Sequence, residues 1–253
     1  IPLTKATGRF VGAVVSEGNI NERSVRFSNT NKEWVLTISE DFAAETETKP
    51  FFKTLKVNNR TFDMHKQSLG NGQITSADVT NANFAVWMME NFGRISHNKT
   101  LPAWILDAPE DFVTGLLQTY FDGDGNVQTE KRHHRLCCHS VSEELITMLS
   151  LCLARFGIPT YIGKEDYKTP AGNPGVISRL TIPMCFAAKF QEHIGFSIDY
   201  KVERLKYVVI EQENETMRGF QAYIPGMNEV LEEIREYIPC GGNKNSFETL
   251  LRK

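Results

Sequence analysis

The chain has 253 residues, of which 41% are hydrophobic and 23% are charged, and its net charge is −3. This length and composition suit one large globular domain or two joined ones, and no run approaches the roughly 18 apolar residues of a membrane span. The N-terminus shows no basic region followed by an apolar stretch, so we expect a soluble, intracellular protein without a membrane partner. The five cysteines form no CxxC pair, which favours reduced, buried thiols over disulfides or zinc.

Helical and strand-like segments alternate through the first part of the chain. Apolar residues at helical spacing predict a first helix over residues 7–17, which ends in Glu17 followed by Gly18. The segments predicted after it are a hairpin of residues 19–22 and 24–30, a helix over 31–44, strands over 51–60 and 72–79, a helix over 81–92 and an extended link over 97–109.

The same order then begins again. The second series consists of a helix over 110–124, a hairpin of 126–131 and 135–140, a helix over 142–156, strands over 159–167 and 176–182, and a helix over 184–193. Both halves read αββαββα, which predicts an α/β (α+β) protein of two pseudo-symmetric repeats. We place the repeats at residues 1–104 and 105–206, followed by a helical C-terminal extension over 207–253.

The two repeats agree in where they place acids and lysines. Glu17 and Asp124 each end an apolar helix and precede a glycine, and they are 107 residues apart. Lys99 and Lys201 each lie six residues after the glycine that ends the third helix of their repeat. A carboxylate at a helix C-terminus is unfavourable, because backbone carbonyls already concentrate negative charge there. The repeated placement therefore indicates a site that needs the acids.

Small residues predict that the first helices of the two repeats pack together. Gly12 and Ser16 are four residues apart, as are Thr119 and Gly123, so the helices can approach about a pseudo-two-fold axis and their terminal acids converge. Two close carboxylates stabilise one another only through cations. We therefore predict a Mg²⁺ site, with Mn²⁺ as a substitute, and its ligands are Glu17, Asp124 and the carbonyls of Ser16 and Gly123.

Such a site suits hydrolysis of a phosphodiester, because bound metal activates water and stabilises the departing oxygen. Lys99 and Lys201 are predicted to supply positive charge to the transition state. A calcium-binding loop over residues 122–133 is excluded, because Val127 stands at the glycine position of such a loop and His133 at its final glutamate position.

These residues resemble the double-motif LAGLIDADG homing endonucleases of the intein-encoded type. The segments that carry the resemblance are FVGAVVSEG at residues 10–18, LQTYFDGDG at 117–125 and KTLPAWILDAPEDF at 99–112. It implies a monomer with internal pseudo-two-fold symmetry, whose two curved sheets form a saddle on double-stranded DNA and whose Mg²⁺ site, Glu17 and Asp124 with Lys99 and Lys201, cuts both strands. Thr119 replaces the usual glycine or alanine, which is expected to widen the helix contact slightly, and Glu17 replaces the commoner aspartate.

Two questions of identity stay open at this point. The chain begins at Ile1 and ends without His-Asn, so we expect an endonuclease segment taken from an intein, or a free-standing relative, that does not splice. A relative that binds DNA or RNA without cutting, such as a maturase or a transcription regulator, is the alternative, and the presence of both acids favours cleavage.

Basic residues on or beside the predicted strands are the expected DNA contacts, most of them to phosphate. This set comprises Arg23, Arg26, Lys53, Lys56, Arg60, Lys131, Arg132, His133, Arg135, Lys164, Lys168 and Arg179.

Overall fold

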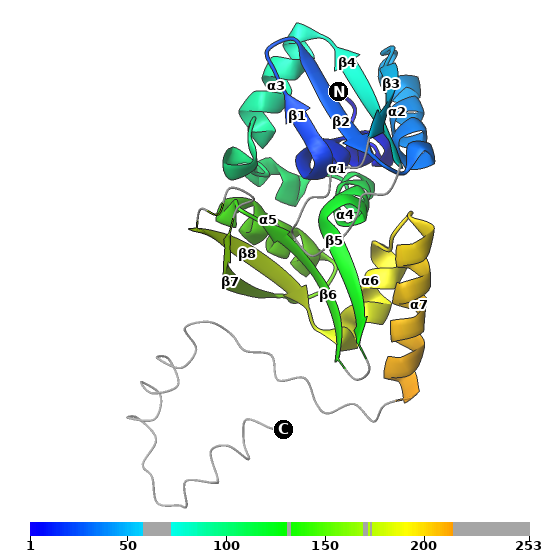
Figure 1. Cartoon of the computed structure of the whole chain (residues 1–253), viewed down its shortest axis with the longest axis vertical. Coiled ribbons are helices and arrows are strands. Elements are labelled where there is room, and N and C mark those ends of the chain that lie inside the picture. The colour runs from blue at the N-terminus through cyan, green and yellow to red at the C-terminus, as the bar shows by residue number, and fades with distance from the viewer. Residues whose placement is uncertain (58–71, 131–132, 169–171, 173, 215–253) are drawn as a thin grey trace, which may run out of the picture. The chain divides into compact units, whose positions relative to one another are not determined.

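A computed structural model describes residues 1–57, 72–130, 133–168, 172 and 174–214. Two units, each a sheet with its helices, lie on either side of a central pair of helices, α1 (Lys5–Glu17) and α4 (Glu110–Asp124), as Figure 1 shows. The predicted α/β class and the order of elements in both repeats are confirmed. No helix within the described ranges is long and apolar enough to cross a membrane.

Each repeat contains one four-stranded antiparallel sheet. In the first repeat α1 is followed by β1 (Gly18–Ile20), β2 (Ser24–Asn29), α2 (Lys32–Thr46), β3 (Phe51–Val57), β4 (Gly72–Thr80) and α3 (Ala82–Phe92). In the second, α4 is followed by β5 (Gly125–Glu130), β6 (His133–Ser140), α5 (Glu143–Arg155), β7 (Tyr161–Lys168), β8 (Pro174–Ile182) and α6 (Ala187–His193). The strand orders, β1-β2-β4-β3 and β5-β6-β8-β7, are the same.

The segments between and after the repeats depart from the prediction in part. The link predicted to be extended over 97–109 includes two short 3-10 helices, Ser96–Asn98 and Ala103–Asp107. In the second of them, Ile105 N donates to Pro102 O. The helix α7 (Asp199–Asn214) extends past residue 206, the predicted end of the second repeat. Residues 215–253 of the predicted helical extension lie outside the described residues, as does the end of the strand predicted over 51–60.

Helix starts follow from capping residues that the sequence places correctly. Asn31, Asn81 and Ser142 each accept a hydrogen bond from the backbone N–H three residues on, at the starts of α2, α3 and α5. Gly93 ends α3 with φ +74°, and a Cβ there would lie 1.8 Å from Asn98 O, so the chain can turn towards Lys99 only with glycine at this position.

The contact between α1 and α4 is made by backbone as much as by side chains. A Cβ on Gly8 would lie 2.1 Å from Phe112 O, and one on Gly12 would lie 2.2 Å from Leu116 O. Thr119 fits because it lies over Gly12, and its Oγ1 donates to Arg9 O across the interface at 2.7 Å. The Thr119 side chain thus forms a hydrogen bond between the helices, and the slightly wider contact expected from it stays a prediction.

Candidate active site

The two helix ends bring the predicted acids together. A Cβ on Gly123 would lie 2.5 Å from Ser16 Oγ and 3.0 Å from Glu17 Cγ, so the last turns of α1 and α4 are in contact. Asp124 is half-buried, whereas Glu17 is exposed and lines a pocket of about 450 Å³ together with Gly123. The structure thus gathers Ser16, Glu17, Gly123 and Asp124 at one place, as the repeat predicted.

The electrostatics of this place are those of two anions held close together. Burial, and next the charge of Glu17, raises the pKa of Asp124 from 3.8 to about 7, although Lys99 and Lys201 oppose the rise. Burial also raises the pKa of Glu17, and the same lysines offset this in part. With a pKa of about 7, Asp124 is only partly ionised at neutral pH when no ligand is bound. A divalent cation at this place would stabilise its ionised form.

Both predicted lysines lie at the site, but they are bonded differently. Lys99 Nζ donates to Ser16 O at 3.0 Å, at the end of α1. Lys201 is buried, and its Nζ contacts four carbonyl oxygens at the end of α4, those of Phe121 (3.0 Å), Asp122 (2.5 Å), Gly123 (3.4 Å) and Gly125 (2.6 Å). A lysine in this position neutralises the negative end of the helix dipole. Burial lowers the pKa of both lysines, while the nearby acids oppose this.

The available ligands suit a hard divalent cation. They are oxygens only, from two carboxylates and from the carbonyls of Ser16 and Gly123, which is the ligand type that Mg²⁺ and Mn²⁺ prefer. No group of three or more His, Cys, Asp and Glu side chains able to hold a metal occurs in the part of the chain that the structure describes. Backbone carbonyls, water or substrate oxygens would therefore have to complete the coordination.

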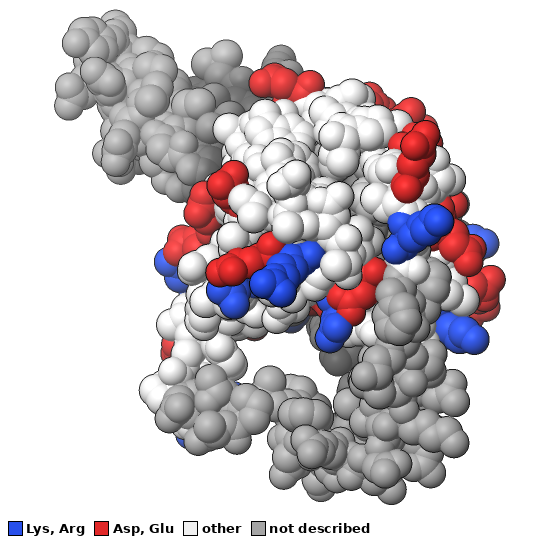
Figure 2. All heavy atoms as spheres, turned by 90° about the horizontal axis from the view of Figure 1, so that it is seen from above, with Lys and Arg blue, Asp and Glu red and all other residues white. Residues whose placement is uncertain are grey.

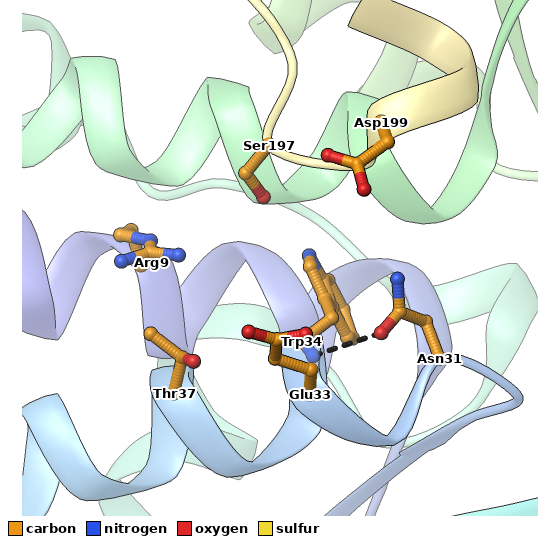
Figure 3. Close-up of a pocket in the computed structure, with 7 residues that line it drawn as sticks. All are labelled: Arg9, Asn31, Glu33, Trp34, Thr37, Ser197 and Asp199. Atoms are coloured by element: carbon orange, nitrogen blue, oxygen red, sulfur yellow. Dashed lines mark hydrogen bonds between the residues drawn. The ribbon is translucent and has the colours of Figure 1, made fainter.

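One residue of the site was missed from the sequence, the buried carboxylate of Asp122. It accepts hydrogen bonds from Trp34 Nε1 (3.1 Å) in the first repeat, and from Ser197 N (2.9 Å) and Ser197 Oγ (2.5 Å) in the second. In Figure 3, Ser197 faces Trp34 across a pocket of about 230 Å³ that lies between the repeats. The available signal was the first acid of the sequence YFDGDG, at the position that corresponds to Val15 in the first repeat.

The predicted DNA contacts separate by sheet face. Arg135 and Arg179 share the face of the second sheet opposite the one that carries the core residues Leu136 and Cys138. Burial, and next the charges of these two arginines, lowers the pKa of His139. Lys164 and Lys168 stand on the opposite face, and Lys164 Nζ pairs with Glu143 Oε2 of α5 at 2.7 Å. The structure thus does not bring these two lysines to the face that carries Arg179.

The remaining basic residues are partly paired with acids. Arg26 is exposed on β2 and bonds Asp78 through its Nε at 2.6 Å, Arg179 is ion-paired with Glu165, and Arg23 is exposed at the turn after β1. Figure 2 shows a similar mixture on one face of the molecule, with Lys and Arg beside Asp and Glu. The predicted contacts whose side chains lie outside the described part are Lys53, Lys56, Arg60, Lys131, Arg132 and His133.

Comparisons with known proteins agree with this architecture. Residues 111–195 match the family described as LAGLIDADG-like domain. The chain is 30% identical over 231 residues to the DNA-directed RNA polymerase subunit Rpo1C of Methanocaldococcus jannaschii, covering 91% of this chain and 24% of that protein. It is 33% identical over 109 residues to the probable translation initiation factor IF-2 of Thermococcus kodakarensis, covering 43% of this chain and 9% of that protein. The chain therefore spans a quarter or less of the length of these relatives.

Two solved structures share the arrangement of helices and strands. The crystal structure of I-DmoI in complex with DNA and Mn superposes with a TM-score of 0.52 at 11% identity, covering 77% of this chain and 98% of that one. Full-length DUF199/WhiA from Thermatoga maritima superposes with a TM-score of 0.52 at 12% identity, covering 93% of this chain and 67% of that one. The chain thus has the LAGLIDADG fold, and its residues 111–195 are similar to the LAGLIDADG-like domain family.

Proposed function

We propose that this protein is a site-specific homing endonuclease, which makes double-strand breaks at a long DNA site by metal-dependent hydrolysis of phosphodiesters. The observation that carries the proposal is the convergence of Glu17 and Asp124 at the contact of α1 and α4, where burial and mutual repulsion raise the pKa of Asp124 to about 7. Folding gains nothing from placing two acids there, so a ligand of positive charge accounts for them better than stability does.

In this proposal each group of the site has a defined task. Glu17, Asp124 and the carbonyls of Ser16 and Gly123 hold Mg²⁺ or Mn²⁺, which when bound activates water and stabilises the departing oxygen. Among the residues that the structure describes, Lys99 Nζ has one carbonyl partner, Ser16 O, so other hydrogens of its ammonium are available for a phosphate oxygen or a water. Lys201 keeps the end of α4 in place and adds positive charge next to Asp124.

The proposed partner is double-stranded DNA, bound by one copy of the chain. I-DmoI has the same fold and is crystallised with DNA and Mn. On this chain, Arg135, His139 and Arg179 stand on the sheet face that points away from the core, where they can contact phosphates. The affinity should then fall steeply with salt, because phosphate contacts release counterions.

We also propose that the chain is of the intein-encoded type. Its matches lie in Rpo1C and in IF-2, which have unrelated names and of which it covers 24% and 9%. A segment carried within different host proteins would give this pattern.

A DNA-binding protein that does not cut is the second candidate. Two observations favour it: Lys201 Nζ is already surrounded by four carbonyl oxygens, and Arg26 and Arg179 are ion-paired with acids. The LAGLIDADG fold also occurs in DUF199/WhiA, whose name specifies no cleavage.

The deciding experiment is selection of cleaved or bound sequences from a randomised DNA library. A plasmid that carries the selected site should become linear with Mg²⁺ and stay intact with chelator. Glu17→Gln and Asp124→Asn should abolish double-strand cutting and leave binding intact, whereas Glu40→Gln, an exposed acid on α2, should cut as the wild type does. Tight binding without nicking by the wild type would favour the second candidate, and full activity of Asp124→Asn would exclude the assigned metal ligands.

A further inference from the structure

Tyr120 carries a buried hydroxyl that makes no hydrogen bond of ordinary geometry among the described residues, although it interacts with the carboxyl of Asp124. The side chain has no exposed surface, and few other side-chain polar atoms in the described part of the chain are buried without a well-formed hydrogen bond. Burying a hydroxyl without a partner costs free energy, and phenylalanine would fill the same volume without that cost. The hydroxyl therefore calls for a functional explanation.

The position of Tyr120 on α4 points to one. It precedes Asp124 by four residues, so the two side chains lie on the same face of the helix, one turn apart. Burial, and next the charge of Asp124, raises the pKa of Tyr120, and a hydrogen-bonding interaction with the Tyr120 hydroxyl opposes the rise in the pKa of Asp124. The other polar group nearby is the buried thiol of Cys138, which is a weak acceptor.

The first repeat lacks this arrangement. Ala13 stands four residues before Glu17, at the position that corresponds to Tyr120, and it cannot hydrogen-bond to the acid. The two acids are therefore supported differently, although their helices are related by the repeat.

We propose that Tyr120 is a positioning residue for Asp124: its hydroxyl donates to one carboxylate oxygen and leaves the other oxygen turned towards the cation. This inference rests on the proposed metal site at Glu17 and Asp124. It makes the two acids of the site unequal, because Asp124 depends on a second residue that would orient it as a ligand, and Glu17 does not. Cleavage of the strand served by Asp124 then depends on Tyr120, and cleavage of the other strand does not.

The test is Tyr120→Phe, which keeps the ring and removes the hydroxyl. Mn²⁺ binding to the complex with the selected DNA is measured by electron paramagnetic resonance, and cleavage is followed separately for the two strands. We expect Mn²⁺ binding at one site to weaken on the order of 10-fold, and we expect slower cutting only of the strand that Asp124→Asn affects most. Tyr207→Phe, which removes an exposed hydroxyl on α7, is the matched control and should change neither quantity.

Three results would overturn the inference. The first is an unchanged Mn²⁺ affinity in Tyr120→Phe, and the second is an equal decrease in the cleavage rates of both strands. The third is a decrease in Mn²⁺ affinity by Tyr120→Phe that is as large in an Asp124→Asn background, where the hydroxyl should no longer matter. A lower melting temperature with unchanged Mn²⁺ affinity would make the hydroxyl structural and count against it too. If the wild type binds Mn²⁺ with its DNA but does not cut, the proposed endonuclease activity fails, and the effect on Mn²⁺ binding still decides the role of Tyr120.

Discussion

Replacing Gly12 by alanine tests whether the contact of α1 and α4 sets the geometry of the site. The new Cβ would lie 2.2 Å from both Leu116 O and Thr119 Oγ1, where ordinary contacts begin at 3.4 Å. One of these atoms belongs to the backbone of α4 and cannot rotate away. The helices would therefore have to separate by about 1 Å at this point.

The size of the effect follows from two opposing terms. Overpacking in a tight interior costs about 1–3 kcal/mol, and we take the upper half of that range because a backbone atom is involved. Alanine gains about 1 kcal/mol over glycine within a helix. The net loss is then about 1–2 kcal/mol, or about 2–8 °C in melting temperature for a chain of this size. Cleavage should fall further than stability does, since Glu17 and Asp124 would move apart.

Urea unfolding and cleavage of the selected DNA measure the two effects of Gly12→Ala. Gly163→Ala is the matched control, because a Cβ there would have no atom within 4 Å and should change the free energy of unfolding by about 0.5 kcal/mol at most. If Gly12→Ala unfolds at the same urea concentration as the wild type and cuts DNA normally, the helix contact does not control the site.

Three further predictions concern the charged residues around the helix ends. Asp122→Ala should destabilise the protein by about 2–4 kcal/mol in urea unfolding, because Trp34 and Ser197 lose a buried acceptor, whereas the same change at the exposed Asp107 should have almost no effect. Lys201→Met should lower the free energy of unfolding by about 2–4 kcal/mol and Lys99→Met by about 1 kcal/mol or less, because the Lys201 ammonium binds more carbonyl oxygens than the Lys99 ammonium does. Equal losses in urea unfolding would contradict this difference in bonding. Folding raises the pKa of Asp124 from 3.8 to about 7, so the folded protein holds a proton that the unfolded chain has lost, and the metal-free protein should lose stability as the pH rises from about 4 through 7. Asp124→Asn should remove that loss, so the mutant should be more stable than the wild type at pH 8 and much closer to it at pH 5; the opposite order would refute the assigned cause.

The sequence predicted those features that depend on local pattern or on the repeat. Helix starts at Asn31, Asn81 and Ser142 follow from side chains that bond their own helix, so they can be read without a partner. The convergence of Glu17 and Asp124 required only that both repeats fold alike.

Features that depend on contacts between residues far apart in the sequence could not be predicted in the same way. The partners of Asp122 are 88 and 75 residues away, and one of them, Trp34, reads from sequence only as a buried aromatic. The face of a strand residue also depends on register, and Lys164 and Lys168 stand on the face opposite Arg179 because β7 pairs Gly163 with Arg179.

The hydrogen bond between Trp34 and Asp122 bears on how the two repeats can have diverged. A symmetric pair of first repeats would place the Trp34 indole against Val15, which accepts no hydrogen bond, and a pair of second repeats would place Asp122 near Leu145, the residue that corresponds to Trp34. A pair of first repeats would bury the Trp34 indole N–H without a partner, whereas a pair of second repeats would leave Asp122 with only its two hydrogen bonds from Ser197. The first repeat has thus become specific for the second, and it could not form a homodimer without a substitution at this contact.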